Sequence, residues 1–141
     1  MSQRSLLAVA MVAALGTSFI LPNTAQAQAA IAVSPNDLTA ISAVAGRGNL
    51  TAVVRALADR LARANPGVSR AEIMSSIAAA VVESYNSGGI SSQNTNEILG
   101  TISADPASSQ DLVAAIADAQ VEIDQGNPVD NDAIASSASQ G

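Results

Sequence analysis

Two carboxylates near the C-terminal end of the chain have a spacing that could support catalysis. Asp118 and Glu122 lie four residues apart, so a helix would place them on one face, and Asp124 follows closely. General acid–base catalysis would need such a pair inside a cleft that shifts the pKa values. The whole chain has one Tyr, one Phe and no Trp to build a cleft for a ring. We therefore interpret the pair as part of a solvated helix face.

Oxygen-bearing side chains slightly further along suggest calcium. They are Asp124, Asn127, Asp130, Asn131 and Asp132. Calcium prefers oxygen ligands, but this spacing is not that of an EF-hand loop, and the closing glutamate is missing. We interpret the group as a solvated acidic tail, with calcium binding as a weakly supported alternative.

The residue types that the chain lacks exclude several kinds of chemistry. There is no Cys, no His and no Lys. Their absence excludes Ser-His-Asp and Cys-His catalysis, Schiff-base chemistry, and the usual zinc and haem ligands. Gly46-Arg47-Gly48 lacks the further glycines and the preceding strand of a phosphate-binding loop. We expect a non-enzymatic protein with no cofactor.

Residues 1–27 have the pattern of a cleaved secretory signal peptide. Arg4 supplies the positive start, residues 6–21 form an almost uninterrupted apolar run, and Ala25-Gln26-Ala27 fits a cleavage site. Cleavage after Ala29 fits the same rule. The apolar run of 16 residues is shorter than the roughly 20 that a membrane-spanning helix needs. We expect a mature chain of residues 28–141 in the periplasm or outside the cell, with no stable membrane insertion after cleavage.

The charges of the mature chain are separated along the sequence. Five Arg stand against twelve acidic residues, a net charge of −7; residues 28–71 carry +3 and residues 72–141 carry −10. This negative charge opposes binding to nucleic acid or to anionic membranes. The separation has three interpretations: attraction between the halves of one fold, which we favour, head-to-tail association between copies, or an acidic face that binds a cation.

Helical periodicity and helix-start signals dominate the mature chain, and no segment alternates as a strand would. Ser34 and Ser69 each begin a capping pattern with an acid three residues later. The predicted helices are residues 35–45, 49–64, 69–85 and 92–103, and one that begins at Asp105 or Ser108 and ends before Gly126. Within the second, Asp59 is placed to pair with Arg63.

These patterns predict an all-α fold. A small bundle of four to five short helices occupies residues 28–126, and residues 127–141 form a flexible polar acidic tail.

Apolar stripes on two predicted helices are candidate contact surfaces. The stripe residues are Leu50, Val54, Leu57 and Leu61, then Ile73, Ile77, Val81 and Tyr85. A core without disulfides and almost without aromatic residues suggests marginal stability, or stability borrowed from self-association. We therefore predict a structural or interaction protein that uses these stripes to bind a second copy or another protein. The alternative is a monomeric module whose acidic half binds a cation or a small ligand.

Overall fold

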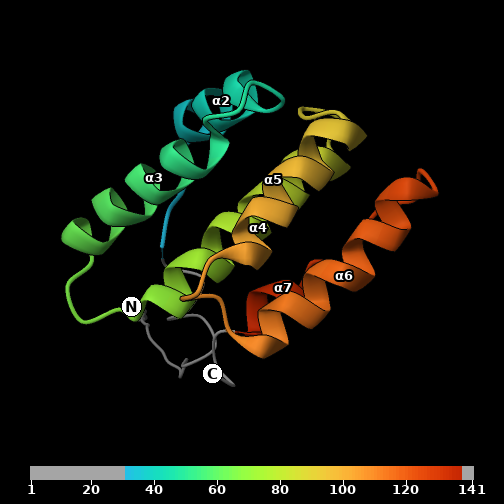
Figure 1. The fold of residues 1–141 in the computed structure, drawn as a ribbon. Coiled ribbons are helices and arrows are strands. Elements are labelled where there is room, and N and C mark those ends of the chain that lie inside the picture. Colours follow the sequence, from blue (N-terminus) through green and yellow to red (C-terminus); the bar gives the residue numbers. More distant parts are fainter. Residues whose placement is uncertain (1–30, 138–141) are drawn as a thin grey trace, which may run out of the picture.

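The computed structural model describes residues 31–137, which form six helices and no strand (Figure 1). The helices are α2 (Pro35–Val44), α3 (Leu50–Ala64), α4 (Arg70–Asn86), α5 (Ser92–Ala104), α6 (Gln110–Asp124) and α7 (Asp132–Ser136). The predicted all-α class is therefore confirmed. The predicted signal peptide lies outside the described residues, as do residues 138–141.

Serine side chains begin four of the helices. At α2, the Oγ atom of Ser34 accepts a hydrogen bond from the backbone N–H of Asp37 at 3.1 Å. The Asp37 carboxylate in turn accepts from the backbone N–H of Ser34 at 3.2 Å, which completes a capping box. Ser69 repeats this box at α4, and Ser91 and Ser109 cap α5 and α6. The last predicted helix therefore begins after Ser109.

The helices α4 and α5 lie in the middle of the bundle, with α2 and α3 on one side and α6 on the other (Figure 1). The short α7 lies against α4 and α6. From α3 to α6, successive helices run in alternate directions, and each loop between them spans five residues. Within residues 31–137, no helix is both long and apolar enough to cross a membrane.

Aliphatic side chains fill the space between the helices. The helix α3 contributes Leu50, Val54, Leu57 and Leu61. The other helices contribute fully buried isoleucines, namely Ile41, Ile73, Ile77, Ile98, Ile102, Ile116, Ile123 and Ile134. Tyr85, the one aromatic residue among residues 31–137, is only half-buried at the edge of this core.

The ion pair predicted inside α3 forms elsewhere. Asp59 Oδ1 lies 2.5 Å from Arg70 Nη1, which stands at the start of α4. The prediction that Asp59 pairs with Arg63 is therefore wrong. Sequence spacing identified a partner within one helix, but the α3–α4 turn brings a closer one.

The segment after residue 126 is not the mobile tail that its composition predicts, at least as far as Ser137. Val129 and Ile134, its two large apolar residues, are both buried. Polar side chains of α4 hold the backbone of this segment. Asn86 donates to the Val129 carbonyl and accepts from its N–H, each at 2.9 Å, and Ser75 Oγ donates to the Ile134 carbonyl at 2.6 Å. The composition of this segment predicted a mobile tail, because composition carries no information on hydrogen bonds from a distant helix.

We expect Ile134→Ala to destabilise the fold by about 2–5 kcal/mol, because it empties a fully buried site. Urea denaturation followed by circular dichroism measures the change. The matched control is Ala133→Ser at an exposed position of α7, where we expect a change within about 0.5 kcal/mol. Equal effects of the two substitutions would show that α7 is not docked.

Candidate functional site

The structure buries the predicted interaction stripe inside the single chain. All four α3 members, and Ile73, Ile77 and Val81 of α4, have at most 5% of their surface exposed. The eighth, Tyr85, is half-buried, and its hydroxyl donates to the Asn127 carbonyl at 3.1 Å. The stripes are therefore core, which corrects the prediction that they form a contact surface. Helical spacing identifies the apolar face of a helix but not what covers it.

The predicted carboxylate pair lies on the surface of α6. Asp118 is exposed, and Glu122 accepts a hydrogen bond from the side-chain amide of Asn127 at 3.0 Å. Neither residue lines the two hollows described below. The pair therefore lies in neither of these hollows, and acid–base catalysis would need a cleft around it.

The proposed calcium ligands have separate surroundings. The Asn131 side-chain amide donates to the Ala79 carbonyl at 3.0 Å, and Asp130 accepts from the backbone N–H of Asp132 at 3.0 Å. Asp124 stands at the end of α6. Among residues 31–137 there is no group of three or more acidic residues close enough to hold a metal ion.

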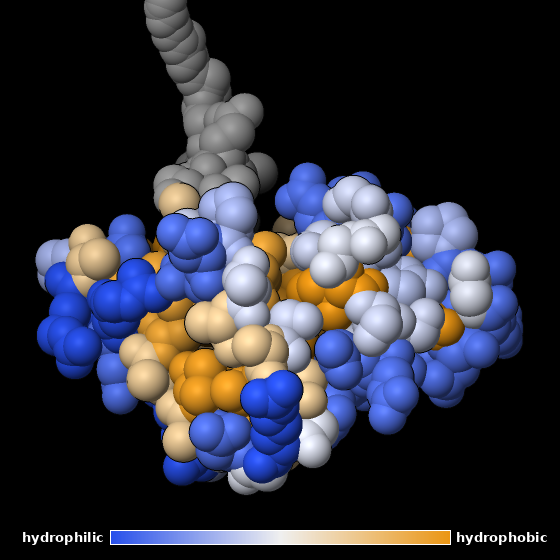
Figure 2. Space-filling view, turned by 90° about the horizontal axis from the view of Figure 1, so that it is seen from above, coloured by the Kyte–Doolittle hydropathy of each residue, from blue (hydrophilic) through white to orange (hydrophobic). Residues whose placement is uncertain are grey.

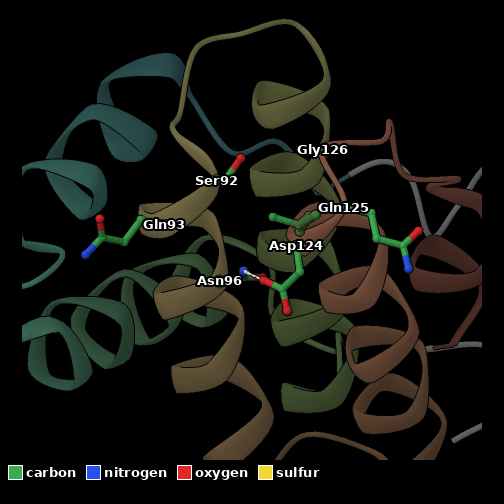
Figure 3. A pocket seen from close by; sticks show the side chains of 7 residues that line it. Ser92, Gln93, Asn96, Asp124, Gln125 and Gly126 are labelled. Atoms are coloured by element: carbon green, nitrogen blue, oxygen red, sulfur yellow. Dashed lines mark hydrogen bonds between the residues drawn. The ribbon is translucent and has the colours of Figure 1, made fainter.

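A polar hollow lies between the start of α5 and the end of α6 (Figure 3). It measures about 550 Å³ and is lined by Ser92, Gln93, Asn96, Ile123, Asp124, Gln125 and Gly126. The side chains of Asn96 and Asp124 point toward each other, while those of Gln93 and Gln125 point away on either side. Asn96 Nδ2 donates to Asp124 Oδ1 at 2.7 Å.

One atom of this hollow lacks a partner. Asn96 Oδ1 is buried, and no group within residues 31–137 donates a hydrogen bond to it. Because this oxygen is buried, the exposed Asp124 carboxylate is the group of the hollow that a polar ligand or a cation could contact. The hollow has one hydroxyl, that of Ser92, and the chain has no histidine to activate it. Asp124 could be singled out from the sequence but Asn96 could not, because an amide near a helix start has no distinctive pattern.

A second hollow lies between α2 and the end of α4. It measures about 420 Å³, and its lining residues are Pro35, Leu38, Thr39, Ser42, Ala43, Ser84, Gly89 and Ile90. Its lining has no charged side chain, so it offers only apolar contacts and hydroxyl groups. The surface seen from above is mostly hydrophilic, with apolar side chains gathered in two groups (Figure 2).

Opposite charges occupy opposite sides of the bundle. The helix α3 has three Arg and one Asp, a net charge of +2, whereas α6 has four acidic residues and no basic one, a net charge of −4. These two helices flank α4 and α5 (Figure 1).

Ion pairs neutralise little of the charge on α6. Arg60 pairs with Asp37, and Arg70 pairs with Asp59, so both bonds stay within the basic half of the chain. Among residues 31–137, a single ion pair joins the two halves, between Arg55 Nε and Asp105 Oδ2 at 3.6 Å. The interpretation favoured from sequence was attraction between the two halves, and this one ion pair is the direct contact between opposite charges that supports it.

The Asp59–Arg70 pair gives a pH-dependent prediction. The hydrogen bond from Arg70 lowers the pKa of Asp59 below its ordinary value; burial opposes this, and the charges of Arg70, Arg63 and Arg55 add to it. A carboxyl whose pKa is lowered in the folded state stabilises the fold above its unfolded pKa. That stabilisation is lost as the pH falls through the folded pKa.

In Arg70→Gln we therefore expect the pKa of Asp59 to rise toward the ordinary aspartate value, as measured by NMR titration of its carboxyl carbon. Arg47→Gln, a change in the exposed turn before α3, serves as the control and leaves the pKa of Asp59 unchanged. An unchanged pKa in Arg70→Gln would contradict the pair.

Comparison with protein-family models, with curated proteins and with solved structures found no match to this chain.

Proposed function

We propose that the chain is an exported, non-enzymatic helical protein that acts through protein–protein contacts in the periplasm or outside the cell. The observation that carries the proposal is the charge separation between the exposed faces of α3 and α6. Charged faces of opposite sign steer partners and select orientation. The signal-like pattern of residues 1–27 supports export.

The non-enzymatic part rests on the side chains at the two hollows. Neither lining contains a nucleophile paired with a base, and the chain offers no His, Cys or Lys to supply one. We therefore place the function on the protein surface outside the hollows. The two charged faces are the most distinctive feature of that surface.

Site-specific photocrosslinking in the producing cell tests the proposal. A photoreactive residue is placed at Ala56 on the exposed face of α3, at Ala117 on the exposed face of α6, or at the control position Ala40 on α2. We expect covalent protein adducts at the first two positions and none at the third. An absence of adducts at all three would overturn the proposal, whatever the identity of the partner.

A second candidate function is a monomeric module that binds a cation or a small polar ligand. It is favoured by the exposed Asp124 carboxylate in the hollow between α5 and α6. A ligand that binds only the folded state raises the melting temperature.

Calcium separates the two candidates. If the protein acts through protein contacts, we expect millimolar calcium to leave the melting temperature of the wild type unchanged. A rise that Asp124→Asn abolishes and the control Asp132→Asn preserves would favour the binding module instead.

A further inference from the structure

We propose that the exposed face of α6 in one copy docks on the exposed face of α3 in a second copy, head to tail. The inference rests on the proposed function and names the partner as the same chain. Among residues 31–137 both faces are exposed, and they lie on opposite sides of the bundle (Figure 1), so one copy can engage a neighbour on each side.

The exposed face of α6 has an apolar centre. Val113, Ala117 and Val121 follow one another at steps of four and so lie along one line of the helix. Val113 is 37% exposed and Val121 is 52% exposed, and they are the exposed large hydrophobic residues of the described part of the chain. Exposed apolar side chains in a row are an unusual feature of a helix that faces only water.

Acidic residues border this apolar line on one side and end it. At 100° per residue, Asp111 and Asp118 fall along one edge of the exposed face, whereas Asp124 falls on the line itself, at its C-terminal end. All three are exposed, and α6 has no basic residue to neutralise them. A partner for this face must therefore offer small side chains opposite the valines and basic side chains opposite the acidic residues.

The exposed face of α3 has that form. Ala52 and Ala56, both exposed, lie at its centre, where small side chains leave room for valines. Arg55 lies along one edge and Arg60 along the other, and Arg63 stands about two turns beyond Ala56, on the same line of the helix. The acid on this face, Asp59, is already paired with Arg70.

Charge excludes the symmetric alternatives. A two-fold dimer through α6 would set four acidic residues against four others, and one through α3 would set arginines against arginines. Only a contact between unlike faces joins opposite charges. Such a contact is heterologous, so it extends into a chain of copies or closes into a ring. Because a single pair of helices of about 22 Å buries little area, we expect the association to be weak and sensitive to salt.

Sedimentation velocity on residues 28–141 tests this directly, over a range of concentrations at low and high salt. Val121→Arg places a positive charge in the acidic face of α6 and leaves α3 intact, and Ala56→Glu places a negative charge in the basic face of α3 and leaves α6 intact. Both positions are exposed, so we expect unchanged circular dichroism. Ala40→Glu on α2 is the matched control. We expect wild type and control to associate, and each blocking variant to bind about tenfold or more weakly, since it brings an unpaired charge to the contact.

The mixture of the two blocking variants gives the sharpest result. The intact α3 of one variant meets the intact α6 of the other, so we expect dimers and nothing larger. Loss of association in only one variant would indicate a two-fold contact and overturn the proposal. A wild type that stays monomeric at low salt would overturn it as well, whereas photocrosslinks to a different protein would leave the proposed function standing.

Discussion

Isoleucine side chains from α2, α4, α5, α6 and α7 meet in the centre of the bundle, and no fully buried aromatic side chain lies among them. Aliphatic side chains bury less area than aromatic ones, so closing the core needs a contribution from every helix. No disulfide can replace a missing contribution, because the chain has no Cys. Under this constraint even the five residues of α7 matter, since Ile134 covers a part of the core that α4 and α6 leave open.

Because every helix must bury aliphatic side chains, each has apolar residues at helical spacing, and most of the fold could therefore be predicted from sequence. Ile73, Ile77 and Val81 repeat at helical spacing, and the capping box at Ser69 marks where their helix begins. Both signals are local. The course of residues 127–137 could not be predicted, because it depends on Asn86 and Ser75, which bond to it from more than forty residues away in sequence. A polar residue on α4 gives no sequence signal of the segment that it will hold.

The candidate sites show the same division between local and distant information. Helical spacing identified the apolar faces of α3 and α4, but the tertiary fold decided that they meet inside one chain. The hollow beside Asp124 depends on Asn96, which lies 28 residues earlier and reaches it only because α5 and α6 lie side by side. The charge asymmetry was visible in the sequence. The placement of the basic and acidic helices on opposite sides of the bundle could be known only from the topology.

That placement follows from the order of the helices. In a bundle of alternating helices, neighbours in sequence lie side by side, so α3 and α6 are kept apart by α4 and α5. No described arginine neutralises the acids of α6 by an ion pair: Arg70 at the start of α4 bonds to Asp59, and the arginines of α3 bond to Asp37 and to Asp105. Within α6, Asp118 and Glu122 stand four residues apart, a spacing at which like charges cost a helix about 0.2–0.5 kcal/mol. Among residues 31–137 no ion pair offsets this cost, whereas the binding face that we propose on α6 would make use of the charge.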